Sequence, residues 1–183
     1  EDQAFCNCIN LKDINIPHNV KTLGSNSFYG CNALTRITIP KSLTKIDYSA
    51  FADCANLSEI QFEDGLKIIG ENMFEGCNSL TQIVIPNSVE SIENNAFRFC
   101  EKLEKLIIED GDTELCIGGF QPWSGTNVTD LYLGRNIGHL PGFYMQTFWV
   151  MSTPTQYTIG EKVTEMSWLA CKNVETIVLK SIV

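Results

Sequence analysis

The chain repeats a pattern of apolar residues every 23 positions, and no other feature limits its fold so strongly. Phenylalanine, cysteine and leucine each recur at this step through five successive copies, which cannot reasonably arise by chance. The three series are Phe5, Phe28, Phe51, Phe74 and Phe97, then Cys8, Cys31, Cys54, Cys77 and Cys100, then Leu11, Leu34, Leu57, Leu80 and Leu103. The sequence therefore predicts stacked units, and positions within a unit are counted from its leucine, position 0.

The pattern continues beyond the fifth copy with altered spacing. Three further copies have position 0 at Val128, Pro154 and Val174. The steps between successive zero positions are thus 23, 23, 23, 23, 25, 26 and 20 residues. We expect one array of about eight units over residues 1–183, regular over 4–108 and irregular over 109–183, with Pro122 and Gly125 at sites meant for Phe and Cys. Since neither end carries a polar cap, the chain is expected to be a fragment of a longer protein.

Each unit alternates apolar and polar residues just after its leucine. Positions +3 and +5 are apolar, which is the pattern of a half-buried strand. A proline at +6 ends this strand in several units, because proline cannot donate to a sheet ladder. The remainder predicts a turn, a short extended piece and about one helical turn. We expect parallel strands centred on residues 14–16, 37–39, 60–62, 83–85, 106–108, 131–133, 157–159 and 177–179.

A single unit is too small to fold alone. It offers about seven apolar side chains, and burial of a large side chain contributes roughly 1.5–3 kcal/mol. Ordering the backbone costs roughly 1–2 kcal/mol per residue, which exceeds this gain over a whole unit. Stability must therefore come from the contacts between neighbouring units, as in a solenoid.

Composition excludes several classes of protein. Hydrophobic residues make up 44% of the 183 residues, so the chain can form a sizeable core. Thirteen basic against 22 acidic residues give a net charge of −9, which argues against nucleic acid as a partner. No apolar run reaches the roughly 18–20 residues of a membrane span, and the acidic start does not resemble a signal peptide.

The regular units read LxxIxIPxxVxxIGxxAFxGC, with residues 73–92 as the best-formed copy. This pattern resembles the BspA-like leucine-rich repeat, also called the Treponema pallidum type, closely over residues 4–108 and more loosely over 109–183. The resemblance implies a leucine-rich repeat solenoid, a right-handed curved α/β superhelix with a parallel sheet on its concave face and short extended or one-turn helical pieces on the convex side. Family members are surface proteins of bacteria and some protozoa, implicated in adhesion to host proteins such as fibronectin and fibrinogen.

Six cysteines share position −3 and should form a ladder of thiols. They are Cys8, Cys31, Cys54, Cys77, Cys100 and Cys171. Stacked identical positions present parallel Cβ vectors, which does not suit a disulfide, and a linear row does not converge on a metal. We expect free, buried cysteines that act as small hydrophobes, whereas Cys6 and Cys116 lie off the ladder and are less determined.

No residue set predicts catalysis, and no cofactor or metal is expected. The two histidines, His18 and His139, lie on distant units and cannot form a cluster. The acidic segments 63–65 and 109–112 have a spacing similar to that of calcium ligands, but neither follows the D-x-D-x-D-G loop, and Asp-Gly is above all a turn former. With no nucleophile, base and orienting group within reach of one another, an enzyme is the least favoured interpretation.

The outward positions of the strands suggest where a partner could bind. Position +4 changes from polar to apolar along the array, and Val84, Ile107 and Tyr132 should form a stripe flanked by Lys105 and Asp130. Apolar patches with a polar rim are typical of binding surfaces, although β-branched residues can also serve strand propensity. A second candidate is the aromatic-rich segment 141–155, in which Phe143, Tyr144 and Trp149 have no template position.

These features favour a non-catalytic binding module at the cell surface or in secreted form. Its partner would be a host extracellular-matrix or cell-surface protein or glycan, bound by the concave face. The alternative is a structural spacer or stalk that displays another domain. A spacer has no reason to align exposed apolar residues, so the stripe discriminates between the two.

Overall fold

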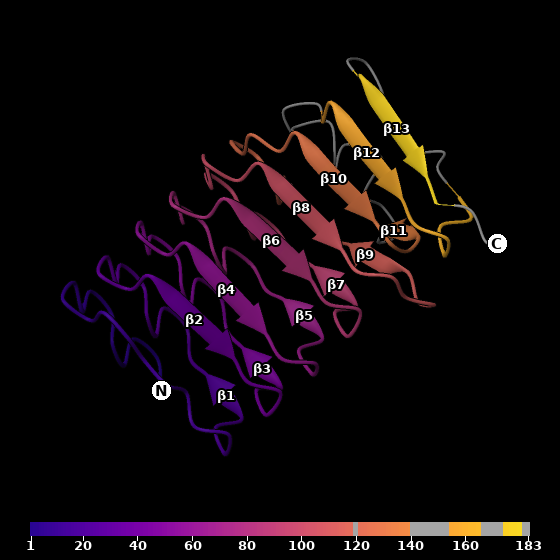
Figure 1. The fold of residues 1–183 in the computed structure, drawn as a ribbon. Helices are drawn as coiled ribbons and strands as arrows, with labels where there is room; N and C mark the ends of the chain where they lie inside the picture. Colours follow the sequence, from indigo (N-terminus) through magenta and orange to yellow (C-terminus); the bar gives the residue numbers. More distant parts are fainter. Residues whose placement is uncertain (119–120, 140–153, 166–173, 181–183) are drawn as a thin grey trace.

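The computed structural model describes residues 1–118, 121–139, 154–165 and 174–180. Within them the chain forms a solenoid in which every turn after the first contributes a long strand, and most turns contribute a short one (Figure 1). The long strands are β2 (Arg36–Ile39), β4 (Glu59–Phe62), β6 (Gln82–Ile85), β8 (Lys105–Ile108), β10 (Asp130–Leu133), β12 (Gln156–Ile159) and β13 (Thr176–Leu179). The short strands are β1 (Thr22–Leu23), β3 (Lys45–Ile46), β5 (Ile68–Ile69), β7 (Ser91–Ile92), β9 (Leu115–Ile117) and β11 (Ile137–His139).

The strands stack in parallel with equivalent positions side by side. One sheet has the order β13-β12-β10-β8-β6, and β2 pairs with β4 beside it. Ile83 pairs with Leu106, and Leu106 with Leu131, so every +3 residue meets the +3 residue of the next unit. The predicted solenoid with one parallel strand per unit is confirmed for the seven long strands.

The first predicted strand, at residues 14–16, does not form. Ile14 and Ile16 pack against the core, but this segment has no ladder to β2. It lies at the end of the stack, where a strand has a neighbour on one side only. This segment lines a cavity of about 300 Å³ together with residues of β2 and β4, and Asp13 Oδ2 lies 3.6 Å from the guanidinium of Arg36.

Side chains alternate between the core and the solvent, as the sequence pattern predicts. The residues at +3 and +5 of β2, β6, β8, β10 and β12 are buried. Strand β13 is an exception, because Ile177 and Leu179 are exposed although the template places them inside. This strand pairs with β12 on one side and has no partner on its other side among the described residues.

The convex turns contain no helix in the described residues, which corrects the predicted helical turn. In each of six turns, two residues four positions apart have φ between 52° and 77°. Such left-handed residues interrupt a helix. They are Gln3 and Asn7, Asn26 and Gly30, Ser49 and Asp53, Asn72 and Gly76, Asn95 and Phe99, and Gln121 and Gly125. Amides in these turns donate alternately within the turn and to the next unit, as Ser27 does to Gly24 and Phe28 to Ala50.

Aromatic rings stack along the interior of the turns. Successive rings from Phe5 to Phe97 have centroids 5.1–5.7 Å apart and interplanar angles of 2–15°. Trp123 adds a sixth ring, 4.9 Å from Phe97, so it is this residue and not Pro122 that takes the phenylalanine position. Phe5 at the end of the stack is 43% exposed, unlike the buried rings from Phe28 to Phe97.

The ladder cysteines are free, and those inside the array are buried. Cys31, Cys54, Cys77 and Cys100 each donate their thiol to the carbonyl of a phenylalanine 26 residues earlier, at 3.2–3.4 Å. Burial raises the pKa of all four thiols. Cys8 is exposed, contrary to expectation, because it lies on the terminal unit. Cys171 lies outside the described residues, and Thr126 occupies the cysteine position next to Trp123.

One unit, residues 57–79, interrupts both hydrogen-bonded ladders. Its long strand β4 pairs with β2 and not with β6, whereas its short strand β5 pairs with β7 and not with β3. At position +5 it carries the larger Phe62, whose ring meets Phe74 edge-on at 6.1 Å, where the flanking units carry isoleucine. The hydrophobic core therefore continues through this unit. The hydrogen-bonded sheets do not: the long strands are unpaired between β4 and β6, and the short strands between β3 and β5.

Candidate functional site

The predicted stripe forms on the outward face of three adjacent strands. Val84 of β6 is paired in register with Ile107 of β8, and Ile107 with Tyr132 of β10. All three side chains are half-buried, so the row is apolar but less open than the sequence pattern suggests.

The charged residues beside the stripe neutralise each other. Lys105 and Asp130 occupy position +2 of neighbouring strands, and Lys105 Nζ lies 2.8 Å from Asp130 Oδ2. Each of the two side chains is still at least one-third exposed to solvent. The structure thus brings all five predicted residues together on β6, β8 and β10.

Tyr132 is held in place by residues that the sequence pattern did not reveal. Its hydroxyl donates to Asp110 Oδ1 at 2.7 Å, and Lys180 Nζ lies 3.4 Å from that hydroxyl and 4.6 Å from the ring centroid. Burial, followed by the hydrogen bond to Asp110, raises the pKa of Tyr132 to about 12. Asp110 and Lys180 come 22 residues before and 48 residues after Tyr132, just beyond the ends of β8 and β13. Extending the strand template by two positions would have found them.

The acidic segments cap the turns of the preceding units. Glu63 Oε2 accepts the amide of Lys41 at 3.1 Å, and Glu109 Oε2 accepts the amide of Asn87 at the same distance. Each carboxylate thereby satisfies a turn donor of the preceding unit. No group of three or more His, Cys, Asp or Glu side chains in the described part of the chain could hold a metal ion.

A buried arginine joins the irregular units to the regular ones. Arg135 is fully buried, and its guanidinium donates to the carbonyls of Pro86 and Asn87 at 2.9 Å. These partners lie two units away. Desolvation lowers the pKa of Arg135, and Glu109 opposes this effect. Arg135 thus reaches across the longer unit that contains residues 109–112 and links the units on either side of it. It supports the strands that carry the stripe and is not itself part of that surface.

Other predicted features fall partly outside the described residues. Phe143, Tyr144 and Trp149 of the 141–155 segment lie among residues that the structure does not describe, as does most of that segment. His18 is exposed. None of the described ranges contains a helix long and apolar enough to cross a membrane.

Comparison with known families explains this architecture. Residues 1–125 match the model of the BspA type leucine-rich repeat region in six copies, which is more than half of the chain. The chain belongs to the BspA-type leucine-rich repeat family. A comparison with curated proteins returns no match.

Solved structures of leucine-rich repeat proteins are similar to this chain. A leucine-rich repeat protein from Bacteroides ovatus matches at 23% identity and a TM-score of 0.59, over 98% of this chain and 57% of that protein. The T. pallidum leucine-rich repeat protein matches at 25% identity and a TM-score of 0.53, over 77% of this chain and 67% of that one. A leucine-rich cell surface protein from Faecalibacterium prausnitzii matches at 19% identity and a TM-score of 0.48, over 99% and 57%. This BspA-type chain therefore spans little more than half of the Bacteroides protein.

Proposed function

We propose that this BspA-type array is a non-catalytic binding module, displayed at the cell surface or secreted, and that it binds a protein or glycan partner through the stripe. The observation that carries the proposal is the row of Val84, Ile107 and Tyr132, placed side by side by strand register. Membership of a repeat family associated with surface proteins supports the location. A host extracellular-matrix or cell-surface partner is the class we propose.

The stripe has the composition of a binding hot spot. Tyrosine supplies a large area with a polar tip, and a central aromatic residue ringed by polar groups is typical of interfaces. Here the ion pair between Lys105 and Asp130 forms the rim on one side, and Asp110 fixes the tyrosine hydroxyl. A pre-positioned ring loses little conformational freedom on binding.

A structural spacer is the competing function, and the stripe separates the two. A spacer needs the core of each unit but no particular residue on the outward face of the sheet. The same +4 position carries Thr38 in β2 and Gln61 in β4, so an apolar residue is not required there for strand formation. The apolar row is confined to part of the sheet, which favours a binding role.

The test is a binding assay against arrays of extracellular-matrix proteins and glycans. The Ile107→Ser/Tyr132→Ala variant should reduce binding to any captured partner by about 30-fold or more, since truncation of a hot-spot residue typically costs about 2 kcal/mol. The matched control is Thr38→Ala/Gln61→Ala, at the same position of two other strands. Circular dichroism must show both variants folded. If the stripe variant bound the partner normally, the partner would have to contact another surface of the array.

A further inference from the structure

The junction between β3 and β5 lacks the hydrogen bonds that its neighbours have. At the β1–β3 junction the amides of Thr44 and Lys45 donate to Lys21, and the amide of Asp47 donates to Leu23. The β5–β7 junction repeats this pattern with Glu90, Ser91 and Glu93 as donors. No backbone hydrogen bond joins residues 44–47 to residues 67–70, all of which the structure describes. The carbonyls of Thr44 and Ile46 are therefore left without their usual partners.

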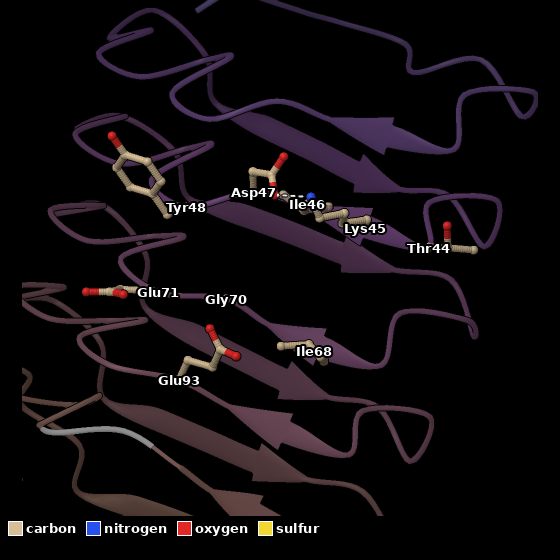
Figure 2. Close-up of a pocket in the computed structure, with 9 residues that line it drawn as sticks. All are labelled: Thr44, Lys45, Ile46, Asp47, Tyr48, Ile68, Gly70, Glu71 and Glu93. Carbon is tan, nitrogen blue, oxygen red and sulfur yellow. Dashed lines mark ion pairs between the residues drawn. The ribbon is translucent and has the colours of Figure 1, made fainter. Parts of the chain in front are cut away.

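A cavity of about 320 Å³ lies at this junction (Figure 2). Its lining includes two exposed large apolar side chains, Tyr48 at 53% and Ile68 at 47%. Gly70 contributes bare backbone, and a Cβ at this residue would lie 3.4 Å from the Ile46 carbonyl oxygen and 4.0 Å from Glu93 Oε2. The junction therefore combines open carbonyls with an apolar rim.

The cavity carries an excess of negative charge. Three carboxylates line it, from Asp47, Glu71 and Glu93, against the single ammonium of Lys45. Lys45 Nζ already pairs with Asp47 at 2.7 Å. No ion pair to Glu71 or Glu93 is formed within the described ranges of the chain. Two carboxylates thus remain free for a cation from outside, and Figure 2 shows Glu93 reaching toward Gly70 from the following unit.

We propose that the β3–β5 junction binds an arginine side chain presented by a basic, extended segment of a partner protein. A guanidinium offers five donors in a plane, which suits a pocket with both free carboxylates and free carbonyl oxygens. Its flat face also stacks on an aromatic ring, and Tyr48 stands exposed beside the cavity. The ammonium group of lysine has neither the paired donors nor the flat face of a guanidinium.

This site is separate from the stripe. It lies on the short strands of the units that begin at Leu34 and Leu57, whereas the stripe lies on β6, β8 and β10. The two surfaces share no residue. A loss of binding at one can therefore be distinguished from a loss at the other.

The experiment uses a fluorescent peptide in which arginine alternates with glycine, and versions with lysine or glutamate in place of arginine. Fluorescence anisotropy at low salt should show saturable binding of the arginine peptide to the whole chain, weaker binding of the lysine peptide and none of the glutamate peptide. Glu71→Gln/Glu93→Gln should weaken binding of the arginine peptide about tenfold or more, because charge-assisted hydrogen bonds are lost. Gly70→Val, which adds bulk without changing charge, should weaken it as well.

Two controls make the outcome decisive. Glu101→Gln/Glu104→Gln removes the same charge from exposed residues of another unit and should leave binding unchanged. Ile107→Ser/Tyr132→Ala should also leave it unchanged. Equal losses with the Glu101/Glu104 variant would show general charge attraction, and normal binding by Gly70→Val would place contact elsewhere. Either result, or equal binding of the lysine peptide, overturns the proposal.

Discussion

A cysteine at position −3 does two things that few other residues can do together. It fills a small apolar space, and its thiol donates to a phenylalanine carbonyl of the preceding unit. Alanine would lack both the donor and the volume of the sulfur atom. Serine would donate more strongly but would cost more to bury. The repeat of this residue through the array therefore has a structural reason and needs no redox chemistry.

The buried thiols should make the protein less stable at alkaline pH. The pKa of Cys54 and of Cys100 is raised from the ordinary 9.0 to about 12 by burial. The unfolded chain therefore releases these protons first, so their contribution to stability is complete below pH 9 and is lost as the pH rises toward 12. One pH unit above 9, each thiol should contribute about 1 kcal/mol less to the free energy of unfolding.

Urea denaturation at about pH 8 and about pH 10 measures this loss. The matched variant is Cys54→Ala/Cys100→Ala, which lacks both titrating groups. It should lose about 2 kcal/mol less than the native sequence over the same pH interval. An identical pH dependence of the two proteins would mean that the thiols do not titrate as buried groups.

At the scale of the strands, unit 57–79 departs from the repeat in its sequence and also loses strand pairing to a neighbouring unit. Phe62 replaces an isoleucine at +5, and Glu63 replaces the proline that follows in neighbouring units. The extra ring is half-buried and packs edge-on against Phe74 of the core. We attribute the lost pairing of β4 with β6 to this larger side chain, because its ring must fit between the strand and Phe74.

Hydrogen exchange should reveal this division. The amides of Lys67, Ile68 and Gly70 have no backbone acceptor in β3, whereas the equivalent Glu90, Ser91 and Glu93 are bonded to β5 and its flanking residue Lys67. We expect the first three to exchange at least about tenfold faster than the second three under native conditions, since unbonded amides open at little cost. Exchange measured by NMR resolves single amides. Equal protection of the two sets would show that β3 and β5 pair in solution.

At the scale of the whole molecule, a stack of six rings runs through the units from Phe5 to Trp123. Each inner ring packs against one before it and one after it, so it belongs to two interfaces. In an array whose stability is the sum of such interfaces, an inner ring matters more than a terminal one.

Replacing an inner ring should therefore be far more costly than replacing the first. Phe74→Ala should lower the free energy of unfolding by about 3–5 kcal/mol, because it leaves a cavity shared by two units. Phe5→Ala, at an exposed terminal ring, should cost about 1 kcal/mol or less. Urea denaturation of both variants provides the comparison, and Phe74→Leu serves if the alanine variant does not fold. A loss as small as that of Phe5→Ala would show that the stack does not stabilise the array.

The period of the sequence was sufficient to predict the solenoid, the long strands and the neighbours of Ile107. Repetition does this because equivalent residues in adjacent units must lie side by side. Where the period drifts, the prediction erred by one residue, and Trp123 rather than Pro122 continues the stack. The contacts of Tyr132 with Asp110 and Lys180 were missed because they depend on side-chain reach beyond the strand. The open β3–β5 junction was missed because the apolar pattern within a unit does not show whether its backbone forms hydrogen bonds with the next unit.

The regular step between hydrogen-bonded units also bears on how the chain folds. Backbone bonds between adjacent units join residues about one unit apart, such as Gln3 with Ser25 and Phe74 with Ala96. Contact order therefore stays near the length of one unit, however many units the chain contains. Folding rate falls as contacts become more distant in sequence, so growth of the array by duplication lengthens the molecule without lengthening its loops. Such a chain can extend its surface while each new unit needs only its predecessor as a template.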